Sequence, residues 1–307
     1  MNMHAPPFLQ KGDKVAVLST ASKIDQSHPE TKEKLEFGIA ELESWGLEVV
    51  RGDTLDAAHH QYAGTDEERI QDFQRMLDDP SIKAIICARG GYGSVRILDH
   101  ISFENYIESP KWISGYSDVT AFHNHINQNF GIQSIHSVMV SAMKGKEKAT
   151  LKSLKKALFG KKLKYKAKGS VLNKSGESSG QVVGGNLSIL YSLMGSNSQL
   201  DTTGKILFIE DVGEKLYHVD RMMMNLKRAG LLNQLAGLVV GGFTNMKDNE
   251  VPYGKTAQEI ILEHTEPFNY PIAFDFPAGH QSMNVALYMG RAASLQVSPQ
   301  KMTLEYK

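Results

Sequence analysis

Apolar residues in the first half of the chain alternate between short continuous runs and longer runs with helical spacing. Residues 14–20 (KVAVLST) and 83–88 (KAIICA) are short runs rich in β-branched residues, which predict buried strands. Residues 31–46 and 65–80 repeat apolar side chains every three to four positions and end at a glycine and a proline, which predicts helices. Alternation of strand and helix at this pitch predicts a parallel sheet covered by helices on both faces.

The second half of the chain contains a larger share of predicted strands. Residues 205–212 (KILFIEDV) predict a strand that ends in two acids, and alternating runs close the chain. Between the halves, residues 146–178 form a lysine-rich segment, which we interpret as a linker. We therefore predict an α/β protein with a parallel-sheet α/β domain over 1–145. A smaller, β-rich, barrel-like mixed domain is predicted over 179–307.

The composition is that of an ordinary globular protein, with 41% of the 307 residues hydrophobic and 22% charged. The formal net charge is zero, so the chain has no overall basic surface for nucleic acid or an anionic membrane. The lysine-rich segment has few interleaved aromatic residues. This favours a solvated helix and linker over a nucleic-acid or membrane patch.

The start of the chain lacks the basic residues and the apolar core of a signal peptide. No stretch approaches the roughly 18–20 apolar residues that a membrane span requires. The single cysteine, Cys87, excludes an internal disulfide and suits a reducing compartment. We therefore expect a cytoplasmic protein.

Residues 112–122 (WISGYSDVTAF) place Ser117 between a predicted strand and a predicted helix. One interpretation is that Ser117 caps the helix N-terminus by accepting hydrogen bonds from its free N–H groups. The other is a nucleophile elbow, although Val119 stands where the G-x-S-x-G pattern requires glycine. Ligands gather at the carboxyl ends of parallel strands, where both Ser117 and the glycine-rich turn 89–93 are expected, and this favours the elbow.

A serine nucleophile needs a base and a third group that orients this base. His280, in a loop after a predicted strand, is the strongest candidate base, and His136 is the alternative. Glu210 is the best orienting acid because a nearly buried glutamate needs a partner. Alternation along the strand predicts that Asp211 points the other way. The competing interpretation is that both acids simply leave the strand and one of them caps the next helix.

The turn at residues 89–93 (RGGYG) has two interpretations. Its glycines let backbone N–H groups approach a substrate, so they supply half of an oxyanion hole, with the Asp118 N–H as the other half. Alternatively the turn holds a phosphate, but neither G-x-G-x-x-G nor a P-loop motif is complete. Metal-binding patterns of histidine, glutamate or cysteine are absent from the sequence. We therefore expect no metal or cofactor.

Seven segments resemble the LD-carboxypeptidase family in their order and spacing. They are GDKVAVLSTAS, AGTDEERIQDF, AIICARGGYGSVRILDHI, ISGYSDVTAFH, VVGGNLSIL, FIEDVGEKLYHVDRMMMNL and PAGHQSMNVALYMGRAASL. The resemblance runs from about residue 8 to residue 300. This family consists of serine peptidases that trim muropeptide tetrapeptides, and it includes the microcin-immunity peptidases.

The resemblance implies a Ser–His–Glu triad divided between two domains. The residues at the matching positions are Ser117, His280 and Glu210, the same three that the residue types and their places favour. In this family the oxyanion hole uses backbone N–H groups of the glycine-rich turn and of the residue after the nucleophile. Here these residues are Gly91 and Asp118.

Two departures from the family pattern bear on substrate specificity. Residues 136–139 read His-Ser-Val-Met where the family often has His-Gly-Pro-Met, and residues 279–281 read Gly-His-Gln where it has Gly-His-Gly. We consider His136 and Arg89 as substrate-binding residues. Arg89 suits the terminal carboxylate of a peptide, and a structural salt bridge explains it equally well.

The resemblance implies a serine carboxypeptidase that hydrolyses the L,D-peptide bond to a terminal D-alanine in cell-wall tetrapeptides, as part of peptidoglycan recycling. The expected partner is a small peptide substrate, with no nucleic acid and no membrane, and a homodimer is a working hypothesis. Two alternatives stay open. One is a related serine peptidase that cleaves aminoacyl-nucleotide toxins, and the other is a non-catalytic module that binds a phosphorylated ligand.

Overall fold

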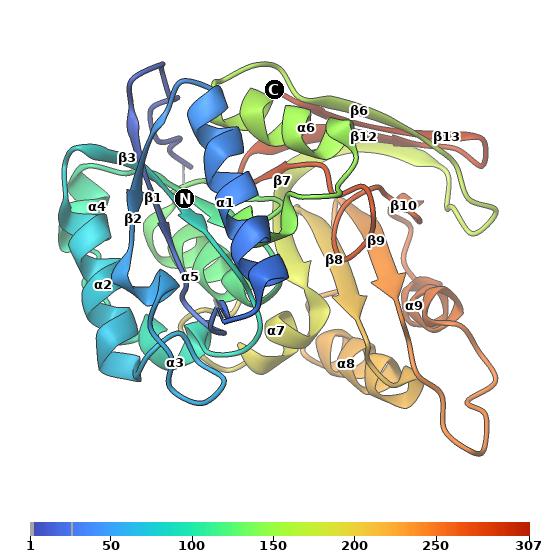
Figure 1. Ribbon diagram of the computed structural model, residues 1–307. Helices are drawn as coiled ribbons and strands as arrows, with labels where there is room; N and C mark the ends of the chain where they lie inside the picture. Colours follow the sequence, from blue (N-terminus) through green and yellow to red (C-terminus); the bar gives the residue numbers. More distant parts are fainter. Residues whose placement is uncertain (1–2, 26) are drawn as a thin grey trace.

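The computed structural model describes residues 3–25 and 27–307, which form two β-sheets lying side by side (Figure 1). The first sheet has six strands in the order β11-β5-β4-β3-β1-β2. Its strands are β1 (Lys14–Leu18), β2 (Glu48–Arg51), β3 (Ile82–Cys87), β4 (Trp112–Gly115), β5 (Ser134–His136) and β11 (Leu287–Met289). Strands β1 to β5 run parallel, whereas β11 is antiparallel to β5. The carboxyl ends of β3 and β4 are therefore neighbours at one edge of the sheet.

Helices cover both faces of the first sheet, because successive apolar side chains of β1 point to opposite faces and each face needs a cover. Val15 and Val17 pack in one core with α1 and α6, whereas Ala16 and Leu18 pack in a second core with α2 to α5. The helices are α1 (Pro29–Ser44), α2 (Asp66–Asp78), α3 (Ser94–Leu98), α4 (Glu104–Glu108), α5 (Thr120–Phe130) and α6 (Lys148–Leu158). The predicted parallel sheet with helices on both faces is confirmed.

The second sheet has seven strands in the order β10-β9-β8-β7-β12-β13-β6. They are β6 (Lys164–Lys168), β7 (Gly176–Asn186), β8 (Ile206–Val212), β9 (Gly237–Thr244), β10 (Ile272–Ala273), β12 (Ala292–Val297) and β13 (Lys301–Tyr306). The long strand β7 pairs parallel with β8 and antiparallel with β12. A single bridge between Lys174 and Ile272 brings the chain just before β7 beside β10, so the sheet curls back on itself. The predicted second, mixed sheet is confirmed.

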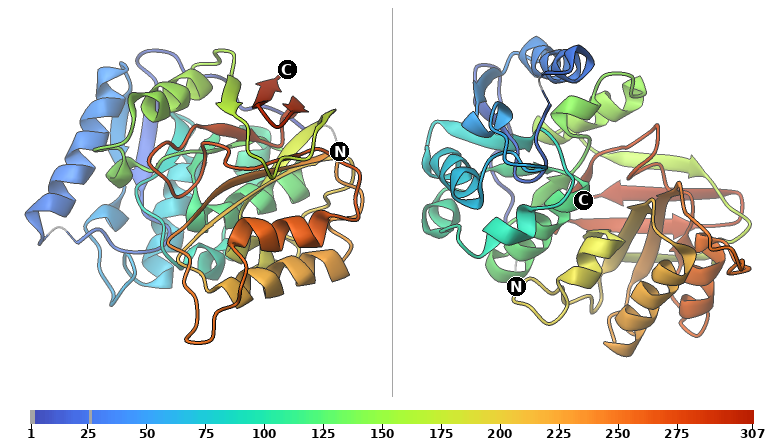
Figure 2. Two further views of the ribbon diagram at one scale, coloured as in Figure 1. Left: turned by 90° about the vertical axis from the view of Figure 1, so that its right-hand side faces the viewer. Right: turned by 60° about the horizontal axis from the view of Figure 1, so that its bottom comes forward.

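Three helices lie together on one face of the second sheet (Figure 2). They are α7 (Leu187–Ser192), α8 (Leu216–Arg228) and α9 (Ala257–Thr265). Met222 and Met223 of α8 have no exposed surface and pack in the core beneath these helices. Both methionines are therefore core residues.

The two halves of the chain exchange elements across the predicted boundaries. Residues 146–178, expected as a linker, contain α6 and β6, and β6 pairs with β13 of the second sheet. Helix α6 buries Leu154 and Leu158 in the core that also contains α1 (Figure 1). In the other direction, β11 from the last third of the chain completes the first sheet. The boundaries at residues 145 and 178 stay predictions.

Cys87 lies at the end of β3 without exposed surface, and burial raises the pKa of its thiol to about 12. It therefore behaves as a core residue rather than as a reactive thiol. Within the described part of the chain, no helix combines the length and the apolar character that crossing a membrane requires.

Candidate active site

Ser117 lies in the turn that joins β4 to α5. Strand β4 ends at Gly115, a single 3₁₀ turn covers Ser117–Val119, and α5 begins at Thr120. The Ser117 backbone has φ = 61°, in the left-handed region that residues other than glycine seldom occupy. Such strain is concentrated at functional sites, and a strained strand-to-helix turn is the geometry of a nucleophile elbow.

The capping interpretation of Ser117 is not what the structure contains. The residue before the 3₁₀ turn is Tyr116, the residue before α5 is Val119, and neither helical segment receives a hydrogen bond from a capping side chain. Within residues 3–25 and 27–307, no group forms a hydrogen bond with the Ser117 hydroxyl. Its side chain is half-buried, so the hydroxyl lies at the surface of the turn without a protein partner.

The glycine-rich turn after β3 packs directly against Ser117. A Cβ added at Gly90 would lie 3.3 Å from Ser117 Oγ, so only glycine leaves this space open. Among the described residues, no acceptor takes the Gly91 N–H, which keeps this amide available for a ligand. The Asp118 carboxylate accepts a hydrogen bond of 2.7 Å from the Ser94 N–H at the start of α3, which ties the two turns together. Gly91 and Asp118, predicted for the oxyanion hole, therefore both lie on turns beside Ser117.

Arg69 of α2 supports the glycine-rich turn from inside the protein. Its side chain has no exposed surface, and Nη1 donates to the carbonyl oxygens of Gly93 at 3.0 Å and Thr20 at 2.7 Å. Burial raises the pKa of the nearby Asp118 carboxyl, and the hydrogen bond from Ser94 opposes this effect. The turn is thus held by a buried cation that sequence reasoning did not single out.

Glu210 and His280 form a hydrogen-bonded pair on the second half of the protein. His280 Nδ1 lies 2.6 Å from Glu210 Oε2, and the His280 backbone N–H donates to the same oxygen at 3.0 Å. A carboxylate only accepts, so Nδ1 carries the proton and Nε2 is the basic nitrogen. The Glu210 side chain is fully buried, whereas that of His280 is 18% exposed. The pair therefore joins a buried acid to an accessible imidazole.

Two neighbours fix the His280 backbone around this pair. Gly279 has φ = 99°, and a Cβ there would lie 2.6 Å from Glu210 Oε2, so glycine is required for the close approach. Thr244 Oγ1, at the end of β9, donates to the His280 carbonyl oxygen at 2.6 Å. The role of Thr244 was not predicted, because no local motif marks it.

Asp211 does not simply point away from Glu210. The Asn186 side-chain amide donates to Asp211 Oδ1 at 3.0 Å and approaches Glu210 Oε1 at 3.4 Å, so both carboxylates reach one partner. The pairing of β8 with β9 shifts register between Ile209 and Asp211, but the extra residue lies in β9, and the shared contact arises because the Asn186 amide reaches both acids. Burial, followed by repulsion from Glu210, raises the pKa of Asp211 to about 6.

The two parts of the site meet at Tyr116 and Thr120. The ring centroids of Tyr116 and His280 lie 4.6 Å apart, so the imidazole is adjacent to the residue before Ser117. Thr120 Oγ1, one turn after Ser117, accepts the Asn186 N–H at 3.0 Å. The structure therefore brings Ser117, Glu210 and His280, which lie far apart in sequence, to one place. Neither Tyr116 nor Asn186 was predicted to contribute, although both belong to segments that the resemblance highlights.

His136 and Arg89, the candidate substrate-binding residues, are placed differently from each other. His136 lies in β5 without exposed surface, with its ring against Tyr116 and Phe208, and burial lowers its pKa well below the usual value. Arg89 is exposed, and its Nη1 donates to the Lys23 carbonyl oxygen at 2.9 Å. Of the two, only Arg89 presents a charged group at the surface.

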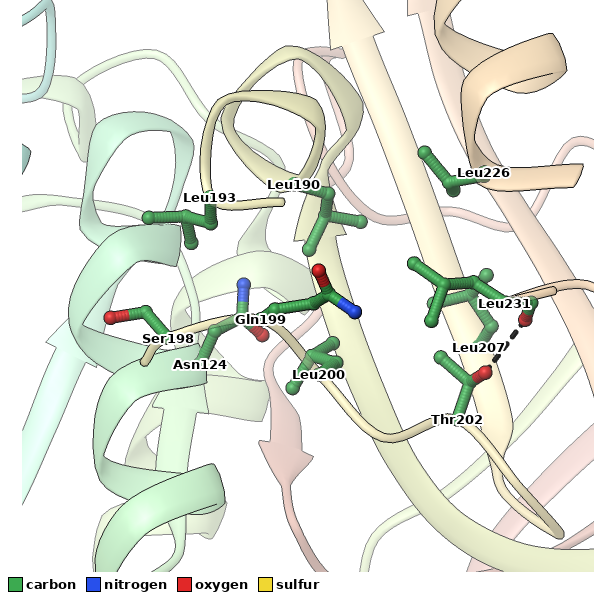
Figure 3. Close-up of a pocket in the computed structure, with 10 residues that line it drawn as sticks. All are labelled: Asn124, Leu190, Leu193, Ser198, Gln199, Leu200, Thr202, Leu207, Leu226 and Leu231. Atoms are coloured by element: carbon green, nitrogen blue, oxygen red, sulfur yellow. Dashed lines mark hydrogen bonds between the residues drawn. The ribbon is translucent and has the colours of Figure 1, made fainter. Parts of the chain in front are cut away.

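A small cavity elsewhere in the protein is separate from these residues (Figure 3). It has a volume of about 20 Å³ and lies between α5, α7 and α8, where leucine side chains and Asn124 line it. This volume suits about one water molecule and excludes a peptide. Over the residues that the structure describes, no group of histidine, cysteine or acidic side chains could hold a metal ion.

Comparison with known proteins agrees with this architecture. A family model described as the LD-carboxypeptidase N-terminal domain matches residues 15–137, and one described as the LD-carboxypeptidase C-terminal domain matches residues 179–295. A probable murein peptide carboxypeptidase of Bacillus subtilis is 34% identical over 98% of this chain and 94% of its own length. A murein tetrapeptide carboxypeptidase of Pseudomonas aeruginosa is 28% identical over 92% of this chain and 93% of its own length.

Solved structures share the fold. The muramoyltetrapeptide carboxypeptidase of Oxalobacter formigenes superimposes with a TM-score of 0.85 at 27% identity, covering 95% of this chain and 98% of its own. The microcin C7 self-immunity protein MccF, in complex with aspartyl sulfamoyl adenosine, has a TM-score of 0.87 at 22% identity and covers 98% of both chains. From the two matching domain models and the relative that is 34% identical along the chain, we conclude that this protein belongs to the LD-carboxypeptidase family.

Proposed function

We propose that this protein is a serine carboxypeptidase that hydrolyses the L,D-peptide bond to a terminal D-alanine in cell-wall tetrapeptides. The observation that carries the proposal is the Glu210–His280 hydrogen bond of 2.6 Å, next to the strained turn that contains Ser117. The substrate is inferred from the murein tetrapeptide carboxypeptidase of Pseudomonas aeruginosa and the related protein of Bacillus subtilis.

In the proposed reaction, His280 Nε2 takes the proton from Ser117 Oγ as this oxygen attacks the peptide carbonyl. Glu210 holds Nδ1–H, which fixes the tautomer, and its negative charge stabilises the imidazolium. His280 then gives its proton to the nitrogen of the departing D-alanine, and water hydrolyses the acyl-enzyme. Apo enzymes often lack the serine–histidine hydrogen bond, which tightens when the substrate binds, so the free Ser117 hydroxyl fits this scheme.

We assign the oxyanion hole to the backbone N–H groups of Gly91 and Asp118. Two observations support this assignment. The close approach of Gly90 to Ser117 puts the glycine-rich turn beside the proposed nucleophile, and the hydrogen bond from the Ser94 N–H to Asp118 ties the two turns together. Pre-organised N–H donors of this kind stabilise the negative charge of the tetrahedral intermediate. For the terminal carboxylate of the substrate we propose Arg89, whose guanidinium is exposed.

Location and assembly complete the proposal. We place the enzyme in the cytoplasm, in peptidoglycan recycling, and expect it to work as a homodimer. We further propose that residues 1–145 act as the unit that carries Ser117 and residues 179–307 as the unit that carries the acid and the base. These points rest on the sequence analysis.

The deciding experiment uses three peptides, which differ at the scissile bond or at the C-terminus, and an aminoacyl nucleotide. One tetrapeptide ends in an L-configured diamino-acid centre followed by D-alanine, one has a D-configured centre at that position, and one is the first peptide with an amidated C-terminus. We expect release of D-alanine from the first peptide alone. Cleavage of the amide at an undiminished rate excludes the carboxypeptidase, and release of aminoacyl groups from an aminoacyl nucleotide instead favours the alternative substrate.

A further inference from the structure

The loop that carries His280, residues 277–285, lies outside every helix and every multi-residue strand. Its two arms are joined by hydrogen bonds from the Val285 N–H to the Pro277 carbonyl oxygen at 2.9 Å and from the Gly279 N–H to Asn284 Oδ1 at 2.8 Å. These bonds close the loop on itself. They do not determine where the loop lies relative to Ser117, which belongs to the first sheet.

One side of the loop is fastened to the second sheet. Glu210 of β8 binds the ring and the backbone of His280, and Thr244 of β9 binds the His280 carbonyl oxygen. These contacts set the position of the imidazole relative to its acid. Placing the same imidazole relative to Ser117 requires a second anchor, on elements that pack against the first sheet.

Helix α6 provides that second anchor, and it packs in the same core as α1 of the first half. Thr150 Oγ1 accepts the Asn284 N–H at 2.9 Å, and Ser153 Oγ accepts the Ala286 N–H at 2.8 Å. Just before the helix, Lys146 Nζ donates to the Gln281 carbonyl oxygen at 2.5 Å. Residues 150 and 153 lie one turn apart on a single helix face, so the chain after His280 runs along this face.

Thr150 is connected to the catalytic histidine through two successive hydrogen bonds. It holds the backbone of Asn284, the Asn284 side chain holds the Gly279 N–H, and Gly279 is directly bonded to His280. Thr150 and Asn284 are both fully buried, so water does not replace these hydrogen bonds when one is removed. A shift of the Asn284 backbone is therefore transmitted to the residue next to the base.

We propose that Thr150 is a positioning residue for His280, and that α6 fixes the position of the His280 loop relative to the half that carries Ser117. Ser153, one turn further along the helix, supports the same position of the loop. This inference rests on the proposed function, in which His280 is the base. It also assigns a role to a segment whose lysine-rich sequence predicts only a linker.

The test compares Thr150→Val, Thr150→Ser and a matched control, Thr265→Val. Valine keeps the shape of threonine but cannot accept the Asn284 N–H, whereas serine can. Thr265 is also fully buried in a helix, but its hydroxyl donates only to Ile261 and Leu262 of its own helix, α9. Each variant is assayed with the L,D-tetrapeptide well below its melting temperature, and rates are normalised to folded protein.

For Thr150→Val we expect kcat to fall by about 10- to 100-fold with KM nearly unchanged, because misplacing a catalytic group has effects of this order. Thr150→Ser should recover most of the rate, and Thr265→Val should retain wild-type kcat even if it melts earlier. A wild-type kcat in folded Thr150→Val, or an equal loss in Thr265→Val, overturns the positioning role. Ser117→Ala is assayed in parallel, because full activity in that variant would refute the proposed function itself.

Discussion

Glu210 Oε2 accepts two hydrogen bonds from one residue, His280: Nδ1–H at 2.6 Å and the backbone N–H at 3.0 Å. A single buried oxygen therefore sets both the tautomer of the imidazole and the position of its main chain. Because Glu210 has no exposed surface, solvent does not compensate for the loss of either bond. Glu210 therefore acts on His280 through two direct hydrogen bonds and not through its charge alone.

Replacement of Glu210 by Gln should lower kcat by about two to four orders of magnitude, because it removes the negative charge and permits the wrong tautomer of His280. Glu210→Asp should fall between this variant and the wild type, since it keeps the charge but shortens the side chain. Rates are normalised to folded protein and read beside thermal melts. Normal turnover in an earlier-melting Glu210→Gln protein would show that the residue has only a structural role. Asp211→Asn is the neighbouring control and should keep a higher rate than Glu210→Gln.

Ser117→Ala and His280→Ala should each abolish nearly all turnover, and the double variant should be little worse than either single one. Groups that act in one proton-transfer step are strongly non-additive in this way. The measurement is kcat/KM for the three variants on the L,D-tetrapeptide. If the fold-loss of kcat/KM in the double variant equals the product of the two single losses, the residues act in separate steps.

Gly90→Ala should yield a folded protein with a roughly 10- to 100-fold lower kcat/KM. The added methyl group would lie 3.3 Å from Ser117 Oγ and 3.1 Å from Met139 Cε. The end of the methionine side chain can move away, whereas the strained serine turn cannot, so the methyl group crowds the nucleophile. Steady-state kinetics and a thermal melt of the variant check this prediction. An unchanged kcat/KM in the folded variant would show that the glycine-rich turn is not part of the site.

The free energy of unfolding should fall as the pH drops from 6.5 towards 4, because His123 and His136 are buried in the neutral form. Burial lowers the pKa of His123 from 6.5 to about 4, so below pH 6.5 the unfolded chain binds a proton that the folded protein does not. Asp211 acts in the opposite direction, since its pKa is raised from 3.8 to about 6 and its folded form takes up a proton first. The contribution of His123 to the pH dependence of stability must therefore be measured by comparing the wild-type protein with a His123 variant.

His123→Gln provides that difference, because its amide can still donate to the Gly115 carbonyl oxygen, which His123 Nε2 contacts at 2.9 Å. Urea unfolding of both proteins between pH 7.5 and 4.5 should show a shallower loss of stability in the variant. The expected difference is about 1.4 kcal/mol per pH unit within the window between the two pKa values. Parallel curves for the two proteins would exclude His123 as a source of the acid sensitivity.

A fragment that ends near residue 145 should be much less stable than the full chain. It lacks β11, which covers the edge of β5, and α6, which buries Leu154 and Leu158 in the shared core. An uncovered strand edge and an exposed apolar core favour aggregation. Circular dichroism and size-exclusion chromatography check this, and a monomeric fragment with a cooperative melt would show that the boundary at residue 145 separates autonomous units.

Most of the local structure, and the proposal for the chemistry of the site, follow from the sequence alone. Short β-branched runs and helical spacing are local signals, and they predicted β1, β3, β8 and the parallel first sheet because each depends on neighbouring residues alone. Ser117, Glu210 and His280 could be proposed as catalytic residues because each stands at the end of a predicted strand or in the loop after it, with a side chain suited to acyl transfer. The family resemblance added the same three residues.

The docking of elements that are distant in sequence depends on tertiary contacts. The pairing of β11 with β5 joins residues about 150 positions apart, and no local pattern specifies such a register. Asp211 shares a partner with Glu210 because the Asn186 amide, at the end of the neighbouring strand β7, reaches both carboxylates. The His136 ring packs against Tyr116, in the turn after β4, and Phe208, in β8 of the second sheet. The lysines of α6 predict a solvated linker, but the opposite, apolar face of this helix is buried. Burial of that face brings Thr150 and Ser153 against the N–H groups of Asn284 and Ala286, which have no partner in a sheet. The helix therefore holds the His280 loop.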